Sequence, residues 1–200
     1  MSKILSSLSK TIHASIALTI LLFLFLFFFH GGFAFDVGFW GSICRFINVV
    51  FTIMWIGLLW YFNFVQIPNM SKIPDDQKHA INNILTPAAL FYFRWAALFT
   101  ILSGLILSLL DGYLYDAITL SINSGIPKHT VIGIGMWLGL IMAFNVWFII
   151  WPNQKRALGM VECNFDLKIK SANQVILFSR VNTLLSIPML FLMVAAQNLY

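Results

Sequence analysis

Five apolar stretches, each about as long as a bilayer is thick, constrain this chain more than any other feature. They cover residues 14–34, 43–67, 88–110, 130–152 and 174–197. An α-helix crosses the roughly 30 Å hydrocarbon layer in about 20 residues. The sequence therefore predicts an all-α integral membrane protein with five spans, joined by the polar segments 68–87, 111–129 and 152–172.

The composition leads to the same class of protein. Of 200 residues, 60% are hydrophobic and 10% are charged, whereas roughly a quarter of an ordinary soluble domain is charged. A chain this short and this apolar cannot bury its hydrophobic surface in a globular core. The basic residues are scattered between the spans and form no stripe, so we expect the lipid bilayer as the partner and no nucleic acid.

The predicted spans divide into an antiparallel four-helix membrane domain, residues 43–200, and an amino-terminal transmembrane helix, residues 1–42. Lys3 and Lys10, followed by an apolar run that ends near Ala34, also fit a secretory signal cleaved after Ala34. The four-helix domain keeps the same orientation in either case.

Positive charge is distributed unequally between the loops on the two sides. Eight basic residues fall on one side and two, Arg45 and Lys128, on the other. The eight are Lys3, Lys10, Lys72, Lys78, Lys155, Arg156, Lys168 and Lys170. The positive-inside rule then predicts a cytoplasmic amino terminus and an external carboxyl terminus.

A second polar feature lies inside the predicted spans. Arg94 and Arg180 each lie about six residues from a cytoplasmic helix end, roughly 9 Å deep at 1.5 Å per residue. Asn63, Asn145 and Asn182 fall at a similar depth. We therefore expect four helices to contribute polar groups to one layer in the inner leaflet.

This layer has two interpretations. No Asp or Glu lies inside any predicted span, and a buried charge must be paired. A bound anion would pair the arginines: a haem propionate, a lipid phosphate or an acidic substrate, each suited to the forked donors of Arg. Alternatively, the amides and guanidinium groups hydrogen-bond one another and hold the helices together, or the arginines extend to the headgroups.

Two histidines, His30 and His129, lie at the outer ends of their helices. They are candidate axial ligands for a haem held across a bundle, although histidines at membrane interfaces are common. Cys44 and Cys163 form no CxxC or CxxCH motif, which excludes a zinc ribbon and a covalent c-type haem. The chain also lacks nucleotide-binding, P-loop, hydrolase and zinc-protease motifs, so no metal site is predicted and catalytic residues are not identified.

Four segments together resemble the bacterial urate oxidase N-terminal domain family, over about residues 43–198. They are WIGLLWYFNFVQIP (55–68), FRWAALFTILSG (93–104), GLIMAFNVWFIIWPNQKR (139–156) and SRVNTLLSIPMLFLMVAAQ (179–197). More distantly, the chain is similar to the membrane protoporphyrinogen oxidase and copper-resistance membrane protein families. The resemblance implies a multi-pass domain of the bacterial inner membrane linked to urate breakdown, of a redox type that binds haem b. It matches the family at Trp55, Gly57, Arg94, Asn145, Pro152, Asn153, Gln154, Asn182 and Pro188.

Departures from the family pattern are as informative as the matches. The resemblance places histidines of urate-linked relatives at the positions of Asn48, Val181 and Gln197 in this chain. Their replacement removes the obvious haem ligands. Some family members continue into a cytochrome c domain, whereas this chain ends at Tyr200 without CxxCH. The resemblance then implies a separate cytochrome c or a quinone as electron acceptor.

The leading functional hypothesis is a membrane oxidoreductase-type domain that binds an anionic cofactor or substrate. Its candidate binding residues are Arg94, Arg180, Asn63, Asn145, Asn182, Asn48, His30 and His129. The alternatives are a non-enzymatic accessory subunit, a small-solute carrier, or a structural protein that binds lipid.

Overall fold

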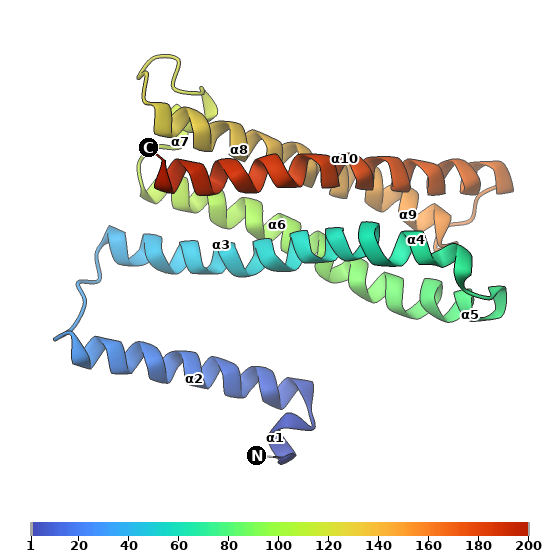
Figure 1. Ribbon diagram of the computed structural model, residues 1–200, viewed down its shortest axis with the longest axis horizontal. Coiled ribbons are helices and arrows are strands. Elements are labelled where there is room, and N and C mark those ends of the chain that lie inside the picture. The colour runs from blue at the N-terminus through green and yellow to red at the C-terminus, as the bar shows by residue number, and fades with distance from the viewer. Residues whose placement is uncertain (1, 200) are drawn as a thin grey trace. The chain divides into compact units, whose positions relative to one another are not determined.

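The computed structural model describes residues 2–199 as helices and connecting turns, with no strand in that range (Figure 1). This confirms the all-α prediction. The chain divides into two compact units, one ending at Trp40 and the other beginning at Gly41. Each unit is described separately below.

The first unit contains α1 (Ser2–Leu5), α2 (Leu8–Phe29) and the first residues of α3 (Val37–Trp60). Helix α2 ends several residues before the predicted end of its span, because Gly31 and Gly32 adopt positive φ angles of 75° and 98°. None of its side chains is buried. A helix that is apolar all round is stable only in an apolar environment, and a bilayer supplies one.

The second unit contains the remaining helices, several of which join end to end into long rods. The first rod comprises α3, the π-helix η1 (Tyr61–Gln66), α4 (Ile67–Asn69) and the 3₁₀-helix η2 (Met70–Lys72). The second comprises α5 (Asp75–Ala80), the π-helix η3 (Ile81–Leu85) and α6 (Thr86–Leu110). After the short α7 (Leu114–Ile118) come α8 (Pro127–Phe144), the π-helix η4 (Asn145–Ile150) and α9 (Trp151–Ala157), and then α10 (Phe165–Asn198).

Five helical rods, α2 and the four of the second unit, are long and apolar enough to cross a membrane. The segment 68–87, predicted to join two spans, is itself mostly helical. The rods 37–72 and 75–110 have 36 residues each, about 54 Å at 1.5 Å per residue, so they exceed the roughly 30 Å apolar layer. Hydropathy detects contact with lipid, whereas a helix continues into water wherever its backbone hydrogen bonds are made.

Each π-helical segment ends two residues before a proline: Pro68, Pro87 or Pro152. Proline has no N–H and its ring clashes with the carbonyl four residues back, so the helix widens there. The residue between each segment and its proline donates its N–H to the carbonyl five residues back, as in a π-helix. These pairs are Ile67 to Phe62, Thr86 to Ile81, and Trp151 to Val146.

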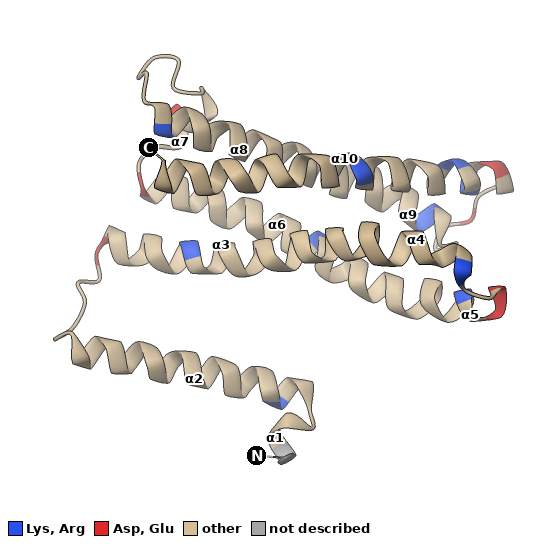
Figure 2. Ribbon diagram, viewed as in Figure 1, with Lys and Arg blue, Asp and Glu red and all other residues tan. Residues whose placement is uncertain are grey.

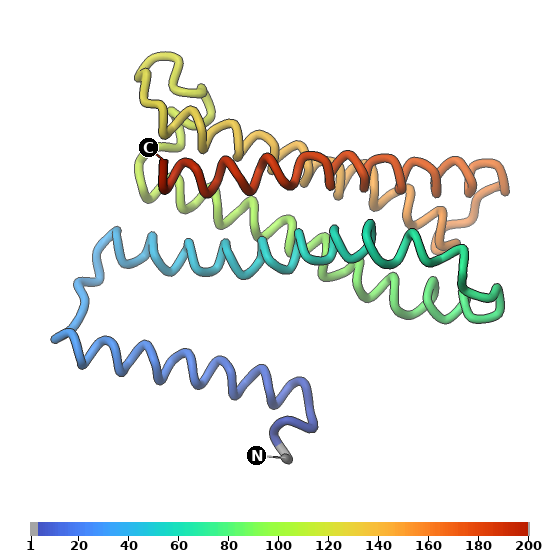
Figure 3. The backbone as a smooth tube through the Cα atoms, in the orientation of Figure 1, coloured from blue at the N-terminus to red at the C-terminus, as the bar shows by residue number. Residues whose placement is uncertain are grey.

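Figure 3 traces the backbone of the four rods of the second unit. A hydrophobic core to which all four rods contribute holds this unit together. Helix α8 packs along α10, and α7 packs on α8. The largest fully buried side chains include Trp55 of α3, Phe93 of α6 and Met142 of α8. The outward surfaces of the same rods expose many large apolar side chains, as expected of helices in contact with lipid.

Charged residues gather at the ends of the second unit. Figure 2 shows Lys and Arg concentrated where α4, α5, α9 and the start of α10 meet. Lys72, Lys78, Lys155 and Lys168 belong to this end. These are four of the eight basic residues that the positive-inside rule assigned to one side of the membrane.

A close approach of α7 and α8 depends on Gly133. A Cβ atom at this position would collide with the backbone carbonyl of Ala117. A Cβ atom added to Gly57, on α3, would meet no other atom within 4 Å. We expect Gly133→Ala to lower the free energy of unfolding by about 1–3 kcal/mol through overpacking. Gly57→Ala should leave it unchanged or raise it by up to about 1 kcal/mol through helix propensity.

Unfolding of the detergent-solubilised protein, followed by circular dichroism, would measure both changes. Equal effects of the two substitutions would contradict the packing argument.

Candidate ligand-binding site

Two amides form the polar centre of the second unit. The Asn145 side chain, 5% exposed, donates its Nδ2–H to the Asn182 Oδ1 at 2.8 Å. Asn182, which is fully buried, donates in turn to the carbonyl of Met142 at 3.0 Å. Asn145 is the first residue of the π-helix η4, and Asn182 lies on α10. The pair therefore connects these two rods through a buried hydrogen bond.

The third amide, Asn63, lies in the π-helix η1. Its Nδ2 donates to the carbonyl of Leu59 at 2.9 Å and to the Ser179 hydroxyl at 2.7 Å. Nearby in sequence, the Trp60 indole donates to the Ser186 hydroxyl at 2.9 Å. Asn63 thus connects the first rod to α10 and is joined to Asn145 and Asn182 only through that helix.

Arg94 has an unusual environment on α6. Its guanidinium carbon lies 3.2 Å from the ring centroid of Trp151 and 6.0 Å from that of Trp147. Its Nε and Nη1 are buried and have no hydrogen-bond partner among residues 2–199. The indole of Trp147 also donates to the Arg94 backbone carbonyl at 3.2 Å. The two tryptophans hold the arginine in place and leave its polar donors unused.

A second cation lies near the same ring. The Lys155 Nζ is 5.6 Å from the Trp151 centroid, and Lys155 is half-buried. No acidic side chain in the described part of the chain forms a salt bridge with Arg94 or Lys155. Two cations without carboxylate partners therefore lie near the Trp151 indole. Of these two, the sequence predicted only Arg94 as a binding residue.

Arg180 does not join this group of residues. Its side chain is exposed, whereas Asn182, two residues further along α10, is fully buried. Residues two apart on an α-helix point about 200° apart, so the two cannot face the same interior. The expectation that Arg180 shares a layer with Arg94 and the three amides is thus wrong for the Arg180 side chain.

The two candidate histidines are in different units. His30 is exposed at the end of α2, in the first unit. His129 is half-buried on α8, with its Nδ1 2.9 Å from the Asp116 Oδ2. Its ring also stacks on Tyr113, with centroids 5.6 Å apart. Asp116 and Tyr113 therefore account for the orientation of His129 without a metal.

Asn48 connects α3 to α6. Its Nδ2 donates to the Thr100 carbonyl at 2.8 Å and to the Ser103 hydroxyl at 3.0 Å. The neighbouring Cys44 donates to the Ser103 carbonyl at 3.2 Å. The Asn48 Nδ2 is thus hydrogen-bonded to α6. The Asn48 side chain also lines a cavity.

The cavity has a volume of about 420 Å³ and lies among α3, α6, α8 and α10. Asn48 and Gln197, two of the positions where the resemblance places histidines in relatives, both line it. Two lining groups are buried without hydrogen-bond partners in the described structure, the Trp55 indole N–H and the Thr100 hydroxyl. Sequence analysis noted Trp55 only as a family position and missed Thr100, because an unpaired donor is a property of the packed structure.

The residues around these sites do not fit a haem with two histidine ligands. The cavity lining contains no imidazole, and the Arg94 environment is formed by tryptophan and lysine. No group of three or more His, Cys, Asp or Glu within the described residues is arranged to hold a metal ion. Neither site therefore offers the histidine pair that would ligate haem b.

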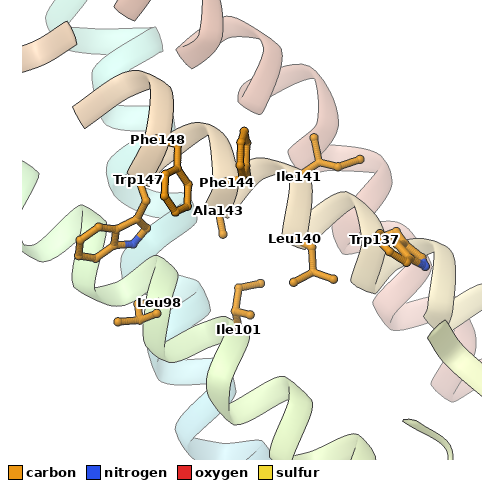
Figure 4. Close-up of a pocket in the computed structure, with 9 residues that line it drawn as sticks. All are labelled: Leu98, Ile101, Trp137, Leu140, Ile141, Ala143, Phe144, Trp147 and Phe148. Atoms are coloured by element: carbon orange, nitrogen blue, oxygen red, sulfur yellow. The ribbon is translucent and has the colours of Figure 1, made fainter. Parts of the chain in front are cut away.

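A second hollow is apolar and lies between α6 and the α8–η4 rod. Figure 4 shows its side chains, which include Ile101, Leu140 and Phe144. Its only polar side-chain groups are the indoles of Trp137 and Trp147, and both already donate to backbone carbonyls. This groove has no polar group left to recognise a ligand, and its surface is of the kind that lipid chains cover.

Comparison with protein families agrees with the resemblance over the carboxyl-terminal part. The family model described as urate oxidase N-terminal matches residues 125–199, which contain α8, η4, α9 and α10. The match includes Asn145 and Asn182. Comparison with curated proteins and with solved structures gave no match.

The Asn145–Asn182 pair provides a test of how this polar centre contributes to stability. Asn145→Leu or Asn182→Leu alone should lower the free energy of unfolding by about 1–3 kcal/mol, because each leaves a buried amide unpaired. The double substitution should cost less than the sum of the two, because neither amide remains. Asn198→Leu, at an exposed position, serves as control.

A double-mutant cycle measured by unfolding in detergent would report the coupling. Strictly additive effects would show that the hydrogen bond between the two amides is not important.

Proposed function

We propose that this chain is a multi-pass protein of the bacterial inner membrane that binds a small anion at Arg94. The proposal proceeds from the match of residues 125–199 to the urate oxidase N-terminal family. The carrying observation is a half-buried guanidinium whose Nε and Nη1 have no partner among the described residues. We further propose that its amino terminus is cytoplasmic, on the basis of the charge distribution.

The chemistry of Arg94 favours an anion with at least two oxygen atoms. Adjacent Nε–H and Nη–H donors match the spacing of a carboxylate or phosphate and bind it in a bidentate manner. Trp151 lies against the guanidinium at 3.2 Å and holds its plane, so little side-chain entropy remains to be lost on binding. Lys155, near the same ring, adds a second positive charge.

The amides have a positioning role in this proposal. Asn145 begins the π-helix η4, which carries Trp147 and is followed directly by Trp151. By fixing this rod against α10 through Asn182, the amide pair holds both tryptophans in register with Arg94. Asn145 and Asn182 are satisfied by each other and by Met142, so no contact of theirs with the anion is required.

A redox role remains part of the proposal on the strength of the family's name. Electrons would then pass to a separate partner, either a quinone in the bilayer or a cytochrome c. Haem b is not included, because neither site supplies a histidine ligand.

One observation favours a second candidate function. The Asn145–Asn182 pair and the Asn63–Ser179 contact hold rods together, which is what polar residues do in membrane bundles without any ligand. Under that alternative the chain is a non-enzymatic accessory subunit or a small-solute carrier.

Substitution of the cations would distinguish the two functions. Arg94→Gln should weaken anion binding by about tenfold or more, because hydrogen bonds to charged groups contribute roughly 1.5–3 kcal/mol. Lys155→Gln should weaken it by less, because its charge lies further from the Trp151 ring. Arg180→Gln removes the same charge from an exposed site and should have no effect.

Isothermal titration of the detergent-solubilised protein with urate, inorganic phosphate and phosphatidylglycerol would measure binding and identify the class of anion. Failure of the unsubstituted protein to bind any of the three, or equal losses for Arg94→Gln and Arg180→Gln, would favour the accessory-subunit alternative.

A further inference from the structure

A second site, distinct from Arg94, is formed by the cavity among α3, α6, α8 and α10. Its volume of about 420 Å³ lies within the usual range of small-molecule pockets. The cavity extends from Arg45 and Tyr113, near the carboxyl-terminal end of α6, to Trp55 and Met189 in the core. None of the residues around Trp151 lines it.

Two buried donors define what this cavity can recognise. Trp55 is fully buried and Thr100 is 9% exposed, and neither the indole N–H nor the hydroxyl has a partner in the described structure. An unpaired polar group in an apolar interior costs about 1–3 kcal/mol, so such groups normally have a partner. The indole can only donate. A molecule that satisfies it must carry a hydrogen-bond acceptor.

The charge of the lining favours a neutral molecule. Arg45 is the only charged residue among the lining side chains, and its Nη2 is already paired with the Asp111 Oδ2 at 2.9 Å. Burial raises the pKa of Tyr113, and the neighbouring Asp111 raises it further while Arg45 opposes this. Tyr113 therefore remains a neutral phenol. The cavity offers an anion no free positive charge.

The remaining lining favours a ring. Met136, Met189 and Met193 contribute flexible thioethers to the lining, and thioethers make favourable contacts with aromatic rings. Leucine, isoleucine and valine side chains make up most of the rest. Asn48 uses its Nδ2 twice on α6, which leaves its carbonyl oxygen as an acceptor for a hydroxyl group.

We propose that this cavity binds a quinone ring, with the Trp55 indole and the Thr100 hydroxyl donating to its carbonyl oxygens. A quinone is neutral, planar and soluble in the bilayer, and it carries the carbonyl acceptors that the two donors require. Its hydroquinone form would in addition donate to Asn48. The proposal concerns binding alone and includes no electron transfer.

Decylubiquinone and menadione, a benzoquinone and a naphthoquinone, are the probes for a titration of the delipidated protein in detergent. Binding of either ring supports the site. Trp55→Phe and Thr100→Val should each weaken binding about three- to tenfold, the usual effect of losing one neutral hydrogen bond. Thr52→Phe, which places a ring in the cavity, should abolish binding by steric exclusion.

Matched controls separate recognition from folding. Trp95→Phe and Thr183→Val make the same chemical changes at positions outside the cavity lining and should bind the quinone normally. Circular dichroism and size-exclusion profiles would verify that each variant is folded. Arg94→Gln should leave quinone binding unchanged, so failure of this site and failure of the anion site are distinguishable.

Three outcomes would overturn the proposal. The first is that neither quinone binds the unsubstituted protein. The second is that Trp55→Phe and Thr100→Val bind as tightly as the unsubstituted protein. The third is that monoolein, an ester without a ring, binds equally well and is equally sensitive to Trp55→Phe, which would assign the cavity to lipid ester carbonyls.

Discussion

The structure depends on one constraint, that a polar group inside an apolar bundle must find its partner within the protein. The amides of Asn145 and Asn182 are the clearest case, because each has a partner and both are buried. Their hydrogen bond connects α10 to the rod of α8, η4 and α9. Water cannot replace such a partner in an apolar interior, so the pair specifies which faces of the two rods meet.

Two sets of buried polar groups without a partner lie at the candidate sites. The buried donors of Arg94 lie against Trp151, where Lys155 adds positive charge. Those of Trp55 and Thr100 line a neutral cavity. The two environments differ in charge, and their ligands should differ accordingly: an anion at the first and a neutral carbonyl compound at the second.

Proline explains a regularity that links the fold to these sites. Each of the three π-helical segments precedes a proline by the same spacing, and two of them contain Asn63 and Asn145. A π-helical turn rotates the following residues relative to an uninterrupted α-helix, so it changes the direction in which Trp151 and its neighbours point. The prolines were evident in the sequence, but their effect on helix geometry was not.

The sequence by itself determined the helical class, the apolar rods and the presence of Asn145, Asn182 and Arg94 within them, because length, hydropathy and an isolated polar residue are local properties. Its match to the urate oxidase N-terminal family over residues 125–199 is also a property of the sequence. Only the tertiary structure decided that Arg180 faces outward, that Lys155 approaches Trp151, and that Asn48, Trp55 and Thr100 share a cavity. Depth along a helix follows from residue number, whereas the direction of a side chain depends on how each rod is rotated and packed against its neighbours.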